Sequence, residues 1–228
     1  MAMSIKQEIF TLLGGRVKIH RGIYNPTSDA VWLASFAPTN ATTVLDVGIG
    51  TGGVSLCMLA HNPNAQITGL DTSDEMLTEC ATNAELNNHT LELINADITT
   101  WRTDRTFDLV ITNPPYFNGS PARHNAHHNA DLVKWVSRCI ARTRPMGTFC
   151  IITDAATSAQ VISTMYAKKL GDITIFPLFG GKSTAERVLI SGRVGTHGIS
   201  VLHGGLSMND TSILRDGLTI ADSLARLS

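Results

Sequence analysis

Short apolar runs alternate with segments of helical spacing along most of this chain. Seven of the apolar runs have the length of buried strands, and they cover residues 44–47, 66–70, 91–94, 107–112, 148–153, 173–178 and 187–191. Apolar residues recur every three or four positions at 54–61, about 73–86 and about 130–142, and again up to residue 165, as expected for helices with a buried face. Strands that alternate with helices are typical of a parallel sheet with crossover helices. The pattern therefore predicts an α/β fold with a doubly wound, seven-stranded, mostly parallel sheet.

The pattern also predicts a single domain over residues 1–228. A leading segment, 1–40, precedes the strand–helix core at 43–193, and a tail follows at 194–228. Of the 228 residues, 43% are hydrophobic and 16% are charged. This balance is that of a folded domain with a sizeable core. We interpret the tail as too short to form a second domain.

Charge and cysteine content narrow the classes of function. The formal net charge is −1 and the pI is near 6.7, whereas a nucleic-acid packaging protein would be more basic. The cysteines, Cys57, Cys80, Cys139 and Cys150, are too far apart for a redox pair or a zinc knuckle, so we predict no metal. Dispersed thiols fit a reducing compartment, and we expect the cytoplasm. No apolar run approaches the ~18 residues that cross a bilayer, and the first residues turn polar too early for a secretory signal.

A glycine-rich loop, DVGIGTGG at residues 46–53, follows the first predicted strand. Glycines leave room for a ligand to approach the backbone amides and the positive end of the next helix. Gly48, Gly50 and Gly53 satisfy the pattern GxGxxG, and Asp71 ends the next strand 23 residues after Gly48. An acid at that place can bind both hydroxyls of a ribose. NAD and S-adenosylmethionine both present such a ribose, so the loop by itself leaves both cofactors open.

A third acid, Asp97, follows the third predicted strand. Asp46, Asp71 and Asp97 thus end three successive strands, and the carboxyl ends of parallel strands meet at the edge where such sheets bind ligands. A carboxylate at the position of Asp97 can accept a hydrogen bond from the exocyclic amine of an adenine. Each acid by itself could be an ordinary turn or cap residue, but three acids at the same edge of the sheet indicate an adenine nucleoside site.

The sequence NPPY, residues 113–116, ends the fourth predicted strand. Two prolines fix the backbone where the chain leaves the sheet. The Asn113 amide oxygen and the Pro114 carbonyl then form a pair of acceptors, which suits an amino group with two hydrogens, while Tyr116 can stack on a planar substrate. An NAD-dependent oxidoreductase has no use for this motif. The motif favours transfer of a methyl group to a planar amino nitrogen.

The order of these motifs resembles the class I S-adenosylmethionine-dependent methyltransferases, which have a Rossmann-like fold. Three subfamilies share NPPY: adenine-N6 methyltransferases of DNA or RNA, guanine-N2 methyltransferases of ribosomal RNA, and glutamine methyltransferases of release factors. The resemblance spans residues ~11–193. More narrowly, LLGGRV at 12–17 and TSDAVWLA at 27–34 resemble the bacterial tRNA-valine adenine-N6 methyltransferases.

This resemblance implies roles for individual residues. S-adenosylmethionine would contact Thr27, Asp29, Asp46, Gly48, Gly50, Gly52, Asp71, Asp97, Ile98 and Asn113. In that set the glycines hold the amino-acid end, Asp71 binds the ribose, and Asp97 with the Ile98 N–H reads the adenine. The leading segment would cover the cofactor and bring Thr27 and Asp29 near its methionine end. Asn113, Pro114 and Tyr116 would hold the target base as the catalytic residues.

Length separates the subfamilies that share these motifs. A release-factor enzyme has a longer leading helical domain, and a sequence-specific DNA enzyme has a large recognition insert. Neither fits here, so we expect no DNA partner and predict a folded RNA, specifically N6-methylation of an adenine in the anticodon loop of a tRNA. Ribosomal RNA guanine-N2 and release-factor glutamine remain the alternatives within the class, and an NAD-dependent oxidoreductase the alternative outside it.

Candidate RNA contacts are basic residues in three places. They are Arg16, Lys18 and Arg21 in the leading segment, Arg123 in the loop after NPPY, and Lys182 between the last two strands. The leading cluster has no acid between Glu8 and Asp29, and a solvated edge strand is its other interpretation. His124 and His128 have metal-ligand spacing, but the polar loop around them favours a lid over the base. We expect the protein to act as a monomer.

Overall fold

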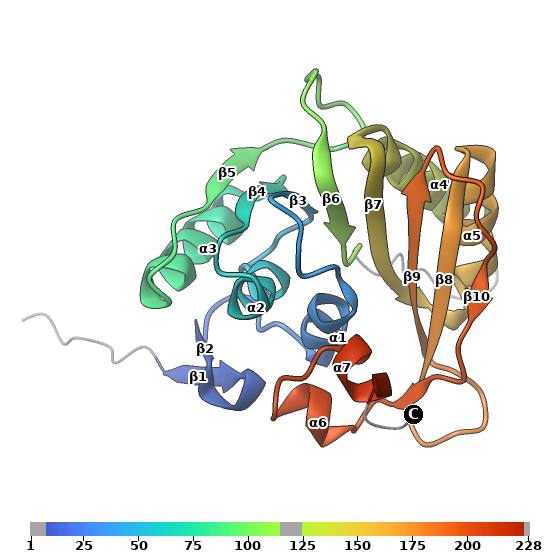
Figure 1. Cartoon of the computed structure of the whole chain (residues 1–228). Coiled ribbons are helices and arrows are strands. Elements are labelled where there is room, and N and C mark those ends of the chain that lie inside the picture. Colours follow the sequence, from blue (N-terminus) through green and yellow to red (C-terminus); the bar gives the residue numbers. More distant parts are fainter. Residues whose placement is uncertain (1–7, 115–124, 226–228) are drawn as a thin grey trace, which may run out of the picture.

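The computed structural model describes residues 8–114 and 125–225 of the chain. All seven predicted strands are present: β3 (Thr43–Val47), β4 (Gln66–Asp71), β5 (Glu92–Asn95), β6 (Phe107–Thr112), β7 (Thr143–Asp154), β8 (Leu170–Phe179) and β9 (Arg187–Val194). The helices that accompany them are α1 (Ser28–Phe36), α2 (Gly53–His61), α3 (Asp74–Leu86), α4 (Asn125–Ala141) and α5 (Ser158–Ala167). Figure 1 shows the sheet through the centre of the molecule with helices packed around it.

The strands of the core lie in the order β5-β4-β3-β6-β7-β9-β8. β5, β4, β3, β6 and β7 are parallel to one another, and β9 is antiparallel to both β7 and β8. From β3 the chain continues to β4 on one side, and β6 lies on the other. The strand order therefore reverses between β3 and β6, and open α/β sheets bind ligands at the carboxyl ends beside such a switch point.

Side chains alternate between the two faces of the sheet and build two cores. Val44 packs with α1 and α2 in one core, and Leu45 packs with α4 and α5 in the other. Successive strand residues point to opposite faces. Because both faces of these strands are buried, their sequences are continuous apolar runs. Trp32 of α1 is completely buried in the first core.

The leading segment begins with a hairpin. β1 (Ile9–Leu12) pairs antiparallel with β2 (Val17–His20) through a 3-10 turn at Leu13–Gly15. Val17 and Ile19 of β2 are buried against the first core, whereas Lys18 between them is exposed. The basic cluster thus lies on and beside a short strand with one apolar face.

The tail takes part in the sheet, which the sequence did not indicate. β10 (Val201–Leu202) and β11 (Leu206–Ser207) each pair parallel with β8, so the sheet has nine strands instead of seven. Strands of two residues carry no alternating pattern that could predict them. Two further helices, α6 (Thr211–Leu214) and α7 (Ile220–Ala225), bury Ile213 and Ile220 in the same core as α1. The leading segment and the tail therefore meet on one face of the sheet (Figure 1).

The four cysteines are free and buried. Burial raises the pKa of Cys57 and Cys80 to about 12 and raises the pKa of Cys139 and Cys150 further, so the thiols stay protonated and act as small apolar side chains. Over residues 8–114 and 125–225, no helix is long and apolar enough to cross a membrane, and no group of three His, Cys, Asp or Glu is placed to hold a metal.

Candidate cofactor and substrate site

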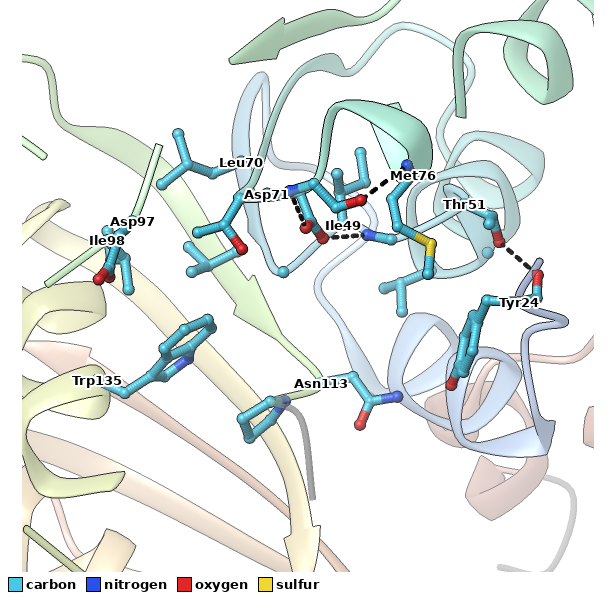
Figure 2. Close-up of a pocket in the computed structure, with 18 of the residues that line it drawn as sticks. Tyr24, Ile49, Thr51, Leu70, Asp71, Met76, Asp97, Ile98, Asn113 and Trp135 are labelled. Atoms are coloured by element: carbon cyan, nitrogen blue, oxygen red, sulfur yellow. Dashed lines mark hydrogen bonds between the residues drawn. The ribbon is translucent and has the colours of Figure 1, made fainter. Parts of the chain in front are cut away.

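A pocket of about 850 Å³ opens at the carboxyl ends of β3, β4 and β6. The glycine loop, the end of β4, the segment after β5 and the end of β6 line it, together with residues from the leading segment and α4. Figure 2 shows these side chains around the pocket. Its volume lies in the range of small-molecule sites, about 300–1,000 Å³, and its place is the one that the strand order predicts.

The glycine loop shapes the floor of the pocket. Gly48, Gly50 and Gly52 have φ values of 75°, 54° and 90°, a region that other residues rarely adopt. A Cβ at Gly50 would meet no described atom within 4 Å, because this position faces the open pocket. A Cβ at Gly52 would lie 2.9 Å from the Cys80 Sγ. Gly50 therefore leaves room for a ligand, whereas Gly52 permits the packing of α3 against the loop.

Asp71 is fixed between two loops at the end of β4. Its Oδ2 accepts from the Gly50 N–H at 2.9 Å, and its Oδ1 accepts from the Ser73 N–H at 3.1 Å. Each carboxylate oxygen keeps a further lone pair. The carboxylate lines the pocket, so it is placed to accept two hydrogen bonds from a ribose diol.

Asp97 and Ile98 line the pocket after β5. The Asp97 carboxylate accepts from the N–H and the hydroxyl of Thr99, at 2.7 Å and 2.9 Å, which fixes its orientation. Ile98 is buried, and among the described residues its N–H has no hydrogen-bond partner. An acceptor beside a free donor is the pattern that complements the amine and N1 of an adenine.

Three of the predicted cofactor residues, Gly52 and two buried acids, do not line the pocket. Asp46 is buried, and its Oδ2 accepts from the Ser55 hydroxyl at 2.7 Å. Burial and the neighbouring charge of Asp71 raise the pKa of Asp46 to about 7. Asp29 is buried too and pairs with Arg187 at 3.1 Å. Neither carboxylate lines the pocket, although Thr27, at the start of α1, does.

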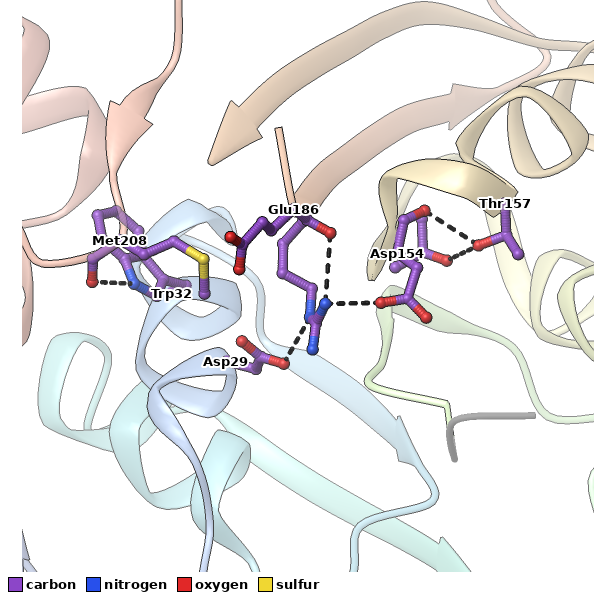
Figure 3. A network of polar contacts seen from close by, with 8 residues as sticks. Asp29, Trp32, Asp154, Thr157, Glu186 and Met208 are labelled. Atoms are coloured by element: carbon purple, nitrogen blue, oxygen red, sulfur yellow. Dashed lines mark hydrogen bonds and ion pairs between the residues drawn. The ribbon is translucent and has the colours of Figure 1, made fainter. Parts of the chain in front are cut away.

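Arg187 joins Asp29 to the carboxyl end of β7. Its guanidinium binds the Asp154 carboxylate at 2.6 Å in addition to Asp29 (Figure 3). The contact links α1, β7 and β9, and its charge-assisted hydrogen bonds hold the start of α1 against the sheet. The role of Asp29 in this structure is thus to anchor the helix that carries Thr27 at its N-cap.

Asn113 and Pro114 follow β6 and line the pocket. Val47 and Thr112 are paired residues of β3 and β6, so Asn113 emerges beside the glycine loop. Figure 2 shows its side chain directed into the pocket, and no described residue forms a hydrogen bond with its amide. Pro115 and Tyr116, the other residues of the motif, lie outside the described residues.

Tyr24 and Trp135 line the pocket as well, although the sequence analysis did not select them. The Trp135 Nε1 donates to the Thr112 hydroxyl at 3.1 Å, which itself donates to the Val47 carbonyl at 2.8 Å. This chain of hydrogen bonds fixes the indole over the ends of β3 and β6. In the sequence, Trp135 is one more apolar residue on the buried side of a helix, and Tyr24 belongs to no motif.

The comparison with protein families agrees with this geometry. The model of the family named methyltransferase small domain matches residues 27–173, more than half of the chain. The chain belongs to this family. It is an S-adenosylmethionine-dependent methyltransferase, and the free donors and acceptors at Asp71, Asp97 and Ile98 fit the ribose and adenine of that cofactor.

Relatives of this methyltransferase include enzymes named for a tRNA and enzymes named for a release factor. The tRNA1(Val) (adenine(37)-N6)-methyltransferase of Glaesserella parasuis is 37% identical over 113 residues, 48% of this chain and 47% of that one. The enzyme of the same name from a Flavobacteriaceae bacterium is 28% identical over 182 residues, 76% of this chain and 78% of that one. The release factor glutamine methyltransferase of Mycobacterium leprae is 27% identical over 195 residues, 72% of this chain and 66% of that one.

A solved structure supports the methyltransferase fold. A predicted O-methyltransferase from Agrobacterium tumefaciens superposes with a TM-score of 0.66 at 23% identity, over 87% of this chain and 95% of that one. With the Glaesserella parasuis relative, the match spans about half of either protein. The family model establishes the family and the superposition supports the fold, and the substrate has to be argued from the site.

The described basic residues that the sequence analysis selects for RNA contact do not line the pocket, whereas Lys134 of α4, which it does not select, does. The Arg16 guanidinium donates to the Gly217 carbonyl at 2.7 Å and thereby holds the tail. Arg21 pairs with Glu8 at 3.5 Å, and Lys18 and Lys182 are exposed; none of the four lines the pocket. Arg123 lies outside the described residues.

Proposed function

We propose that this methyltransferase transfers a methyl group to the exocyclic N6 amine of an adenine in the anticodon loop of a tRNA. The observation that carries the proposal is the Asn113 amide, which points into the pocket from the end of β6 and has no partner among the described residues. A polar group left unpaired at a ligand site indicates a ligand that completes its hydrogen bonds. A planar amino nitrogen has the two donors that such a site requires.

The chemistry follows from where the residues stand. S-adenosylmethionine, when bound, supplies a methyl group on a positively charged sulfur. Asn113 and the Pro114 carbonyl accept the two N–H bonds of the target amine, which turns its lone pair toward the pocket. Asp71 and the segment at Asp97 and Ile98 hold the cofactor on the other side. No residue has to remove the proton before transfer, so the chain contributes mainly alignment of the reacting atoms.

Two lines of support favour tRNA adenine over the other substrates of the class. Two of the relatives described above carry the name of a tRNA adenine-N6 enzyme, and an unpaired loop base leaves its stack at low cost. The relative from Mycobacterium leprae supports a glutamine of a release factor as the second candidate. That acceptor is also a planar amide nitrogen, so the site chemistry by itself accommodates it. With tRNA as substrate, we expect a cytoplasmic protein that works as a monomer and binds no DNA.

Nucleoside mass spectrometry tests the proposal. Total tRNA from cells with and without the protein is digested, and the fraction of N6-methyladenine is compared. Loss of this nucleoside, restored by wild-type protein and not by the Asn113→Ala variant, is the expected result. Purified protein is then offered unmodified tRNA, ribosomal RNA and a release factor in parallel. Methylation of the release factor or of a ribosomal guanine, with tRNA left unmodified, would overturn the proposal.

A further inference from the structure

Tyr24 forms a wall of the pocket that no sequence motif indicates. The residue lies between β2 and α1, lines the pocket, and is 42% exposed. Figure 2 shows its ring at the end of the pocket where Asn113 projects. An aromatic side chain this exposed adds little to the core, so packing does not explain why it lies at the wall of the pocket.

Helix α3 holds the segment that leads to Tyr24. Glu79 and Asn83 of α3 and its C-cap residue Asn87 follow one another at intervals of four residues. Each accepts a hydrogen bond from a backbone N–H group of the leading segment: Glu79 from Ile23 at 3.0 Å, Asn83 from His20 at 2.9 Å, and Asn87 from Lys18 at 2.8 Å. These three contacts fix the path of β2 and of the residues after it along α3.

The contact at Glu79 requires a glycine beside it. A Cβ at Gly22 would lie 1.8 Å from the Glu79 Oε1, so a larger residue would displace the carboxylate. Gly22 allows the chain to approach closely enough for the Ile23 N–H to reach Glu79. The segment is thus anchored one residue before Tyr24.

Asn83 connects the same segment to the glycine loop. Its side chain is buried, and its Nδ2 donates to the Thr51 carbonyl at 3.0 Å while its Oδ1 accepts from His20. The Thr51 hydroxyl in turn donates to the Tyr24 carbonyl at 3.4 Å. The wall at Tyr24 and the loop at Thr51 are therefore held at a fixed separation.

We propose that Tyr24 is a substrate-positioning residue whose ring packs against the planar group that carries the acceptor nitrogen and holds that group beside Asn113. Glu79 does not touch the substrate; it holds the Ile23 N–H and thereby positions Tyr24. This inference rests on the proposed methyl transfer to a planar amino nitrogen. An aromatic face binds any planar base or amide, so it sets the placement of the acceptor and leaves its identity to other contacts.

The ionisation of Tyr24 agrees with such a role. Burial and the charge of Asp29 raise the pKa of Tyr24 above its usual value. A phenol of ordinary pKa, about 10, is already neutral at physiological pH, and the shift widens that margin, so the ring can face a base without bringing a negative charge near it.

Kinetics of Tyr24→Ala and Tyr24→Phe test the proposal. The assay uses full-length protein and the substrate that the wild type methylates among tRNA, ribosomal RNA and release factor. Tyr24→Ala should lower kcat/KM by about 10- to 100-fold, as expected for loss of one stacking contact, with the Kd for S-adenosylmethionine within twofold of the wild type. Tyr24→Phe, which keeps the ring, should stay within about threefold. Tyr166→Ala is the matched control, because Tyr166 is 54% exposed on α5 and does not line the pocket.

The variants Glu79→Ala and Glu79→Gln test the positioning role. Glu79→Ala removes the acceptor of the Ile23 N–H and should lower kcat/KM, as Tyr24→Ala does, through a higher KM for the methyl acceptor. Glu79→Gln keeps an oxygen acceptor, so its KM should stay close to that of the wild type. Equal KM values for both Glu79 variants and the wild type would overturn the role of Glu79. A wild type that methylates one of the three substrates, with Tyr24→Ala unchanged in kcat/KM, would overturn the inference alone. A wild type inactive on all three would overturn the proposed function and the inference with it.

Discussion

The two sides of the pocket differ in how their polar groups are used. On the glycine-loop side, formed by Gly50, Asp71 and Asp97, each carboxylate already accepts two hydrogen bonds from nearby loops. On the substrate side, formed by Tyr24 and Asn113, the Asn113 amide has no partner among the described residues. The first side is rigid before a ligand arrives, which reduces the cost of ordering on binding. The second side leaves hydrogen bonds for a substrate to complete.

This difference separates binding from turnover. Substitutions on the glycine-loop side should act on the Kd for S-adenosylmethionine, and those on the substrate side on kcat or on the KM for the methyl acceptor. A substitution on the glycine-loop side that changes kcat, or one on the substrate side that changes the Kd for S-adenosylmethionine, would show that the two sides do not act independently.

The largest effect is expected for Asn113→Ala. Loss of a preorganised polar group that acts in the transition state lowers turnover by about 10²- to 10³-fold, while the Kd for S-adenosylmethionine should change less than threefold. Single-turnover methyl transfer and calorimetry measure the two quantities. Asn95→Ala is the matched control, since Asn95 ends β5, lies outside the pocket and binds Asp74. Near wild-type turnover of Asn113→Ala would show that NPPY does not hold the acceptor.

The next largest effect is the pH dependence of stability at Asp46. Its pKa is about 7 in the folded protein, mainly through burial, against about 3.9 in an unfolded chain. Between these values the folded protein holds a proton that the unfolded chain has released, so stability falls as pH rises from about 4 to about 7. Asp46→Asn removes this dependence. Relative to the variant, the wild type should lose on the order of 3 kcal/mol of unfolding free energy between pH 5 and pH 8.

Chemical denaturation of cofactor-free protein at several pH values measures this difference. The Ser55 hydroxyl donates to the Asp46 carboxylate at 2.7 Å and lowers its pKa. Ser55→Ala should therefore shift the decline in stability to higher pH. Parallel pH profiles for the wild type and Asp46→Asn would mean that Asp46 is ionised in the fold at low pH.

Asp71→Ala should weaken binding of S-adenosylmethionine by about 1.5–3 kcal/mol, the range for hydrogen bonds to a charged group. Turnover at saturating cofactor should change little, because Asp71 lies on the glycine-loop side. Asp74→Ala, three residues further along and outside the pocket, is the control. A variant that binds the cofactor normally and loses turnover would break the division between the two sides.

The parts of the site that could be predicted from the sequence are those next to strands. Asp71, Asp97 and Asn113 lie at or just after the ends of apolar runs, and the register of a parallel sheet brings such ends together. Asp29 and Asp46 could not be placed this way. Nothing in the sequence shows that Arg187, 158 positions away, pairs with Asp29, or that Asp46 turns toward Ser55.

The N-cap of α3 is another feature that depends on tertiary contacts and could not be predicted from the sequence. The start of α3 is predicted within one or two residues, but the sequence does not decide between Thr72 and Ser73 as its N-cap; in the structure the cap is Ser73, which accepts from the Met76 N–H at 3.2 Å. Both residues suit an N-cap by type, so the choice depends on how β4 ends. Tyr24 and Trp135 were missed for a related reason, since their place in the pocket depends on contacts with α3 and Thr112.

The smallest effect is expected on the basic face of the leading segment, where the structure separates Arg16 from Lys18 and Arg21. Arg16 holds the tail through the Gly217 carbonyl, whereas Lys18 is exposed and the guanidinium of Arg21 lies over the Phe10 ring and forms an exposed pair with Glu8. Exposed pairs contribute little and exchange readily for a phosphate.

Joint replacement of Lys18 and Arg21 by alanine should reduce the slope of log K against log salt for tRNA by about 1.4–1.8, since each phosphate contact contributes about 0.7–0.9. Binding at moderate salt should weaken less than tenfold, and the Kd for S-adenosylmethionine should not change. Arg16→Ala is the matched comparison: it should lower thermal stability and leave the salt slope as it is. Filter binding over a salt series, with melting curves for all variants, measures both quantities. A flatter slope for Arg16→Ala would show that the three cations form one RNA-binding face, and an unchanged slope for the double variant would place the RNA on another surface.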